Sequence, residues 1–304
     1  MTAPLARRVA AVLACAAGAS CVRAPTDSGP PLVVATIFPV ADLVAQVGGD
    51  AVRVQTLLPP RASLHTWEAT PAQVRSLSHA QAYVTVGGGL DGWLEEFGAD
   101  LPTLRTLRLT DGMRLRRADA AHAGEETGVE GSGDPHVWLD PILVRDEILP
   151  RIAALLVEIV PARRGELQAR AAAVADSLTA LDGEIRRLLA GRQRSGFVAT
   201  HDAWAYFAER YGLEAIGNLY EGPGHEPSAK ALAGIVDAAR TAGLTTVLTE
   251  PQLSESAARA LAAELDADVV QVDPLGGSGQ AGREGYLDLM RFNARAFARA
   301  LGAP

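Results

Sequence analysis

The two halves of this chain are separated by one long helical pattern, residues 161–190, which read PARRGELQARAAAVADSLTALDGEIRRLLA. Pro161 suits the first turn of a helix and Gly191 suits its end, whereas Gly165 and Gly183 weaken the pattern slightly. About thirty helical residues would extend about 45 Å, which is longer than one domain of this size needs. We therefore predict a single rigid helix that runs along two domains and joins them.

Short apolar runs alternate with helical patterns on both sides of this helix. Such alternation is typical of parallel strands that are covered on both faces. We predict an α/β fold of two lobes, each a roughly four-stranded parallel sheet flanked by helices. The expected strands are residues 32–37, 52–58, 82–86, 104–109, 197–200, 215–219, 246–249 and 269–272. The expected helices are residues 40–47, 71–80, 91–99, 203–211, 227–241, 255–265 and 285–301.

These patterns also give the expected domain division. An N-terminal lobe spans residues 32–160, the linking helix spans 161–191, and a C-terminal lobe spans 192–304. The first lobe contains an acidic segment without apolar periodicity, residues 118–133, which carries His122. Two interpretations of this segment stay open: a loop that collects metal ions weakly through His122 and its negative charge, or a solvated insertion.

Residues 1–21 have the features of an export signal. Arginines precede an apolar stretch that is too short to span a bilayer, and small residues then lead to Cys21. This end resembles a bacterial lipobox, in which the Cys is lipidated, although Gly18 stands where Leu is usual. We expect an exported protein, either periplasmic or anchored outside the cytoplasmic membrane through lipidated Cys21, with residues 22–31 as a flexible tether. Simple secretion with cleavage nearby is the alternative.

The composition is that of a globular protein and narrows its partners. The 304 residues are 48% hydrophobic and 21% charged, and the net charge of −8 argues against nucleic acid as a partner. Both cysteines, Cys15 and Cys21, lie in the leader, so the mature domains contain no thiol. A metal site in these domains therefore has to use histidine and carboxylate ligands.

Four metal-competent side chains stand at or just beyond predicted strand ends: His65, His136, His201 and Asp273. A lone histidine is more often a surface or hydrogen-bonded core residue, so only the set predicts a metal site. Ligands of open α/β sheets gather at the carboxyl ends of strands, and two candidates come from each half, so the four would meet in the cleft between the lobes. Three imidazoles and a carboxylate are the ligand set of a closed tetrahedral zinc site.

Five short segments surround or neighbour these residues: HTWEATP at 65–71, DPHVWLDP at 134–141, THDAWAYF at 200–207, EPS at 226–228 and TEPQ at 249–252. With these segments the chain resembles the cluster A-I solute-binding proteins of ABC transporters, which capture zinc or manganese outside the bacterial membrane. The resemblance runs from about residue 32 to residue 301. It implies two α/β lobes joined by one long helix, and it implies that His65, His136, His201 and Asp273 are the ligands.

The choice between zinc and manganese depends on the third imidazole. Zinc takes nitrogen ligands in tetrahedral geometry, whereas manganese favours oxygen-rich sites. In the family that the chain resembles, manganese binders often carry a carboxylate at the third position. Here that position is His201, which favours Zn²⁺ as the transported ion, with Mn²⁺ as the alternative.

Carboxylates close to the histidines are candidates for orienting them. A ligating imidazole usually donates its other N–H to a carboxylate or a carbonyl. We expect Glu68, Asp140 and Asp202 in this role, because each lies close in sequence to one of the three histidines. His79 and His225 are expected to be structural or exposed.

The function that these observations predict is an extracytoplasmic binding protein. It would capture Zn²⁺ between its lobes and deliver the ion to an ABC-transporter permease, as a monomer without catalytic activity. A manganese-binding member of the same family is the alternative, followed by a zinc-dependent hydrolase and a surface adhesin. The sequence has no H-E-x-x-H motif, nucleophile elbow or phosphate-binding glycine loop that would favour catalysis.

Overall fold

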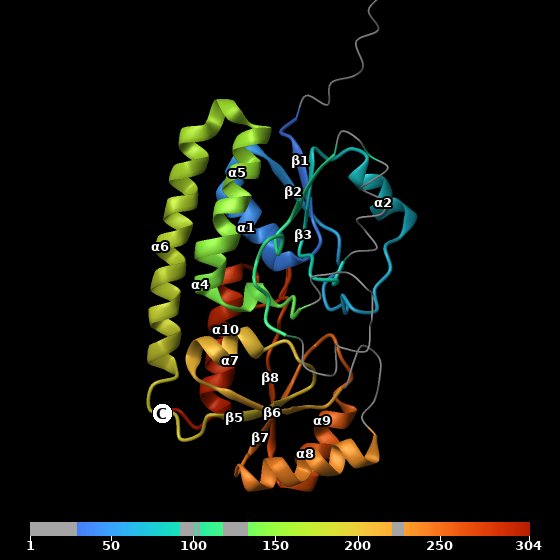
Figure 1. The fold of residues 1–304 in the computed structure, drawn as a ribbon, viewed down its shortest axis with the longest axis vertical. Coiled ribbons are helices and arrows are strands. Elements are labelled where there is room, and N and C mark those ends of the chain that lie inside the picture. Colours follow the sequence, from blue (N-terminus) through green and yellow to red (C-terminus); the bar gives the residue numbers. More distant parts are fainter. Residues whose placement is uncertain (1–28, 92–100, 102–103, 118–132, 221–227) are drawn as a thin grey trace, which may run out of the picture.

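The computed structural model describes residues 29–91, 101, 104–117, 133–220 and 228–304. These residues form two lobes, and the long helix α6 runs along one side of the first and ends beside the second (Figure 1). The predicted α/β architecture is confirmed, because each lobe holds a four-stranded parallel sheet, in the order β2-β1-β3-β4 or β6-β5-β7-β8. All eight predicted strands occur: β1 (Leu32–Ala35), β2 (Arg53–Thr56), β3 (Ala82–Thr85), β4 (Arg105–Arg108), β5 (Gly196–Ala199), β6 (Glu214–Asn218), β7 (Thr246–Thr249) and β8 (Asp268–Gln271).

Helices cover both faces of each sheet, which explains why the central strands β1, β3, β5 and β7 are mostly apolar and buried. In β1, Val33 joins the core cluster that contains α1, whereas Val34 joins a smaller cluster with Leu77 of α2 on the opposite face. Successive side chains of a strand point to opposite faces, so a strand covered on both sides is apolar throughout. The helices around the sheets are α1 (Phe38–Gly48), α2 (Pro71–Leu77), α7 (Ala205–Tyr211), α8 (Ala229–Thr241) and α9 (Ser256–Leu265), with the short turns η1 (Gly49–Ala51) and η2 (Val137–Leu139).

The strand order determines where a ligand can bind. The first strand of each sheet lies between the second and the third, so the connections diverge between β1 and β3 and again between β5 and β7. Residues that follow two such neighbouring parallel strands lie side by side at the carboxyl edge of the sheet. In the second lobe, His201 follows β5 and Glu250 follows β7.

The predicted linking helix is present as α6 (Arg164–Leu188). Its 25 residues extend about 38 Å. It begins three residues later than Pro161, because Pro161–Arg163 form the separate 3-10 turn η4. The buried side of α6 carries an apolar stripe that faces the lobes and consists of Leu167, Val174, Leu178, Leu181 and Ile185.

The last helix, α10 (Tyr286–Ala300), connects the two lobes a second time. At its start, the N–H of Tyr286 donates to Asp42 of α1 in the first lobe at 2.8 Å. Further along, Phe297 stacks on Phe207 of the second lobe with ring centroids 4.8 Å apart. One core cluster accordingly contains residues of both lobes. The expected boundaries at residues 161 and 191 therefore separate the two sheets, whereas α10 packs against both lobes.

The sequence patterns do not predict the helix that precedes α6. It consists of α4 (Pro141–Leu143), a π-helical turn η3 (Val144–Ile148) and α5 (Leu149–Ile159). Two prolines nine residues apart normally indicate helix ends, because proline lacks the N–H and clashes with the carbonyl four residues earlier. The wider π turn lies just before Pro150 and lets the helix continue past it.

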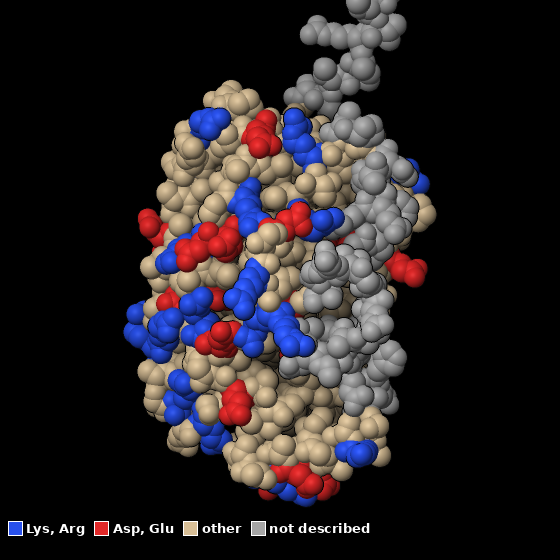
Figure 2. All heavy atoms as spheres, in the orientation of Figure 1, with Lys and Arg blue, Asp and Glu red and all other residues tan. Residues whose placement is uncertain are grey.

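Some predicted features lie outside the described residues. They are the export signal, Cys21, most of the tether, the helical pattern at 91–99, His122 with the acidic segment, and His225. Within the described part of the chain, no helix is both long and apolar enough to cross a membrane. On the face shown in Figure 2, basic and acidic side chains lie side by side. Ion pairs of the described residues include Arg145–Asp146, Arg163–Glu166 and Arg186–Asp182.

Candidate metal centre

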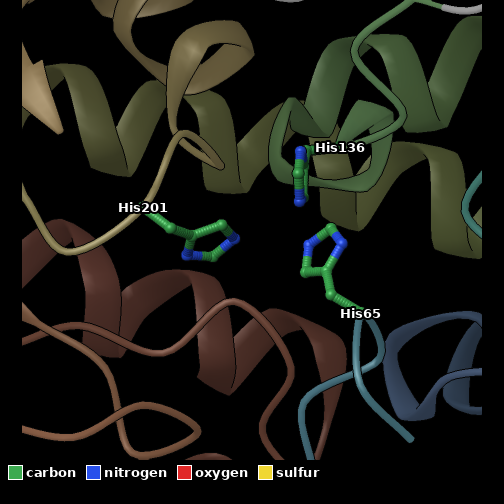
Figure 3. Close-up of side chains that lie close together, drawn as sticks. All are labelled: His65, His136 and His201. Carbon is green, nitrogen blue, oxygen red and sulfur yellow. The ribbon is translucent and has the colours of Figure 1, made fainter. Parts of the chain in front are cut away.

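Three of the four predicted ligands converge between the lobes. His65 comes from the loop after β2, His136 from the segment before η2, and His201 from the end of β5 (Figure 3). One ring nitrogen of each lies within 4.8 Å of the others, and the ring centroids are 5.3 to 5.8 Å apart. Nitrogens around a tetrahedral zinc are about 3.3 Å apart, given Zn–N bonds of about 2.0–2.1 Å. Small side-chain movements would therefore bring the three imidazoles onto one ion.

Asp134 fixes the orientation of His136. Its Oδ1 lies 2.8 Å from Nδ1 of the imidazole and also accepts the backbone N–H of His136 at 2.9 Å. Both residues are buried, with 2% of His136 and 4% of Asp134 exposed. A carboxylate on Nδ1 favours the tautomer in which Nδ1 carries the proton, so Nε2 is left to bind a metal.

A second buried carboxylate, that of Glu250, lies beside the imidazole of His201. Its Oε2 lies 2.6 Å from Nδ1 of His201, and its Oε1 accepts a hydrogen bond from Nε1 of Trp204 at 2.9 Å. Burial is the largest single influence and lowers the pKa of His201, but the Glu250 carboxylate together with the charges of Asp202 and Asp134 outweighs it, and the pKa is raised above 6.5. Glu250 is 1% exposed, so its charge acts in a poorly solvated environment.

Of the three carboxylates that we expected beside the imidazoles, Asp140 has another partner. Asp140 forms a bidentate ion pair with Arg210 of α7 at 2.8 to 3.0 Å and caps α4 through the N–H of Ile142. This ion pair replaces the expected imidazole contact of Asp140. Glu68 is exposed, and Asp202 is buried next to His201, where its charge contributes to raising the pKa of that histidine. His79, expected to be structural or exposed, is exposed.

Asp134 and Glu250 were not predicted as partners of the histidines. Both stand inside the quoted segments, but only the fold shows which carboxylate faces which ring. A usable signal was present for Glu250. It directly follows β7, a strand whose four residues are all buried, and an acidic residue in such a position needs a polar partner.

Asp273 does not join the three histidines in this structure. Its Oδ1 accepts from Gln252 Nε2 at 2.8 Å and from the N–H groups of Leu275 and Gly276 at 3.0 Å. Its Oδ2 forms an ion pair with Arg283 at 2.8 Å. Both side chains are largely buried, at 2% and 13% exposure, so Arg283 already neutralises the Asp273 charge. Among the described residues, the group with metal-binding geometry consists of the three histidines.

The cavity that the three imidazoles enter has mainly apolar walls. Trp138 contributes one wall, and its Nε1 donates to the carbonyl oxygen of Pro274 at 2.8 Å. Apolar walls limit the access of water and strengthen electrostatic interactions at the site. The other apolar and aromatic residues that line the cavity are Leu64, Leu90, Tyr220, Leu253 and Leu275.

Several known proteins match this chain over most of its length. A family model described as the periplasmic component A of the zinc-uptake complex (ZnuA) matches residues 33–300. The high-affinity zinc uptake system protein ZnuA of Paracoccus denitrificans (strain Pd 1222) is 31% identical over 325 residues, which cover 96% of this chain and 98% of that protein. The protein of the same name from Bacillus subtilis (strain 168) is 26% identical, covering 95% of this chain and 94% of its own length.

Solved structures agree with this assignment. A crystal structure of ZnuA matches with a TM-score of 0.80 at 31% identity, over 90% of this chain and 99% of that chain. A Zn(II)-bound mutant variant of AdcAII from Streptococcus pneumoniae has a TM-score of 0.78 at 24% identity, covers 90% of this chain and 98% of its own, and shows the shared fold alone. The resemblance drawn from the sequence motifs is thus confirmed. The chain belongs to the family of periplasmic component A of zinc-uptake complexes, within the zinc and manganese solute-binding proteins of ABC transporters.

Proposed function

We propose that this chain captures Zn²⁺ with His65, His136 and His201 and delivers it to an ABC-transporter permease outside the cytoplasmic membrane. The observation that carries the proposal is the convergence of the three imidazoles from separate segments of both lobes. Two of the rings already have a buried carboxylate at Nδ1, which is the usual support of a ligating histidine. The names of the relatives, which are zinc uptake proteins, agree with this function.

The ligand chemistry supports zinc over manganese. Three nitrogen ligands suit Zn²⁺, whereas Mn²⁺ prefers oxygen donors and a higher coordination number. The one candidate oxygen ligand, Asp273, is held by Arg283 and three other donors. The fold itself does not choose the metal, because an Mn-bound periplasmic protein from Candidatus Liberibacter asiaticus matches with a TM-score of 0.77 at 17% identity.

A hydrolytic zinc site is the alternative that three histidines leave open, since catalytic zinc often has three protein ligands and a water. Such a site also needs a general base that is free to accept a proton. Within the described cavity lining, the carboxylate is Glu250, which already contacts His201 and Trp204. The arrangement therefore favours binding over catalysis.

The test is a competition titration of the mature protein, from Val22, with zinc and manganese and a chelator of known affinity. We expect one tight zinc site that tenfold more manganese does not displace, and loss of that site in His65→Ala, His136→Ala and His201→Ala. Retention of manganese against zinc would move the assignment to manganese uptake. The absence of a tight site would overturn the metal-binding function.

The same titration of the Asp273→Asn variant shows whether Asp273 binds zinc as a fourth ligand or only pairs with Arg283. If Asp273 acts through Arg283, the variant keeps zinc affinity within a few fold, while the free energy of unfolding falls by about 3 kcal/mol, because Arg283 loses its buried partner. A loss of zinc affinity as large as that of the histidine variants would instead identify Asp273 as the fourth ligand.

Export and anchoring are part of the same proposal. We infer that the protein acts as a monomer and is exported, with lipidation at Cys21. Metabolic labelling with a radioactive fatty acid tests the anchor, and Cys21→Ser is its control. Label in the wild type alone would support lipidation, whereas release of unlabelled wild-type protein into the soluble fraction would favour simple secretion.

A further inference from the structure

The hydroxyl group of Tyr206 connects the two lobes next to the metal site. Tyr206 lies in the first turn of α7 in the second lobe. Its hydroxyl donates to the carbonyl oxygen of Asp134 at 3.0 Å and accepts the backbone N–H of Arg116 at 3.0 Å, both in the first lobe. The residue is 7% exposed, and burial raises the pKa of Tyr206 to about 12, so the hydroxyl keeps its proton for the bond to Asp134.

The two backbone partners of this hydroxyl also bind each other. The N–H of Asp134 donates to the carbonyl oxygen of Arg116 at 2.9 Å. Tyr206 therefore closes a three-part junction in which each residue contacts the other two. Arg116 also forms an ion pair with Glu209 of α7, and its guanidinium lies 5.9 Å from the centre of the Tyr206 ring. The junction holds the backbone of Asp134 against α7.

Asp134 in turn holds His136, one of the predicted metal ligands. Its carboxylate contacts His136 twice, through the backbone N–H at 2.9 Å and through Nδ1 at 2.8 Å. The segment that leads into α7 carries His201, whose ring centroid is 5.3 Å from that of His136. The Tyr206 hydroxyl thus connects Asp134, which contacts His136, to the segment that carries His201.

We propose that Tyr206 is a positioning residue of the metal site, which sets His136 relative to His201 by holding Asp134 against α7. This inference rests on the proposed zinc-binding function. Tyr206 is not among the residues that line the metal cavity, so it acts through Asp134 and not by binding the ion. Loss of its hydroxyl would leave the Asp134 carbonyl oxygen and the Arg116 N–H without this partner and give His136 more freedom.

The test compares Tyr206→Phe with Tyr211→Phe. Tyr211 is a matched control, because it lies on the same helix, is also buried, and has its ring beside Arg186 of α6 and not at the metal cavity. We expect Tyr206→Phe to raise the zinc dissociation constant about tenfold, mainly through faster release, and Tyr211→Phe to leave it within about twofold. The Co²⁺-loaded protein should show altered visible absorption bands in Tyr206→Phe alone.

Thermal unfolding of both zinc-free variants shows whether a loss of affinity reflects general destabilisation. Equal zinc affinity and equal cobalt spectra in the two variants would overturn the positioning role of Tyr206. If the wild type and Tyr211→Phe also lack a tight zinc site, the proposed zinc-binding function is wrong, and the inference about Tyr206 is wrong with it. Zinc binding in the wild type together with an unaffected Tyr206→Phe refutes the inference alone.

Discussion

At the residue scale, two buried carboxylates accompany the three imidazoles of the candidate metal centre. Asp134 and Glu250 are nearly inaccessible to solvent, and each faces Nδ1 of a histidine. Burying a carboxylate is costly unless it is paired, so these positions are best understood as supports for the rings. They also bring negative charge close to the place where a divalent cation would bind.

Removal of either charge should weaken zinc binding without removing a ligand. We expect Asp134→Asn and Glu250→Gln each to lower zinc affinity about 10- to 100-fold, because the imidazole loses basicity and its fixed orientation. Chelator competition measures the effect. Glu68→Gln is the control, since Glu68 is exposed and should change affinity by less than twofold. Equal affinities in all three variants would contradict the supporting role of the buried carboxylates.

The pH dependence of zinc binding should report the contact between His201 and Glu250. Because Glu250 raises the pKa of His201 in the folded protein, this pair stabilises the zinc-free protein below about pH 6.5, and the contribution is lost as pH rises through the raised pKa. Zinc needs the neutral ring, so its affinity should begin to fall above pH 6.5 as the solution is acidified. In Glu250→Gln, the fall should begin at lower pH.

Zinc dissociation constants measured between about pH 8 and about pH 5 test this prediction. The melting temperature of the zinc-free protein over the same range is a second measurement, and it should show a smaller pH dependence in Glu250→Gln than in the wild type. A pH profile that is identical in the two proteins would mean that Glu250 does not control the titration of His201.

At the element scale, the sequence predicts the alternating strands well and the helix that contains an internal proline poorly. The central strands β1, β3, β5 and β7 are predictable because each is a short, mostly buried apolar run, and a strand covered on both faces has no polar side to obscure it. The edge strands carry polar residues such as Arg53 and Arg105, and their pattern is weaker. The helix over 141–159 is not predictable, because Pro150 in its middle is tolerated only through a local π turn. Asp140 shows the same limit, since a carboxylate two residues before Ile142 fits a helix cap as well as a metal site.

The start of this helix gives a test of that assignment. Asp140→Ala removes the cap of α4 and the bidentate bond to Arg210, so the free energy of unfolding should fall by about 2 to 3 kcal/mol. Asp146→Ala, in an exposed pair with Arg145, should cost less than about 1 kcal/mol. Denaturant titration of the zinc-free variants measures both. A loss of zinc affinity in Asp140→Ala without loss of stability would restore Asp140 as an imidazole partner.

At the scale of the whole molecule, the two lobes share their support. The helix α6 runs along the first lobe and reaches α7 of the second through Arg186 beside Tyr211, and α10 binds Asp42 at one end and packs on Phe207 at the other. The length of α6 could be predicted from the sequence, because its pattern has no strong interruption. The shared role of α10 could not, since it depends on contacts between residues 244 positions apart in the chain.

A core that spans both lobes predicts unfolding in one cooperative step, whereas two sheets with separate cores in a chain of 304 residues would unfold in two. Circular dichroism and tryptophan fluorescence should therefore give the same denaturation midpoint in the zinc-free protein. Zinc at 100 times its dissociation constant should stabilise this single transition by about 2.7 kcal/mol, because the ion binds only when both lobes hold their histidines in place. The His65→Ala variant should show the same single transition without the zinc effect. Two separate midpoints would mean that each lobe folds on its own core, and that α6 and α10 connect the lobes without coupling them.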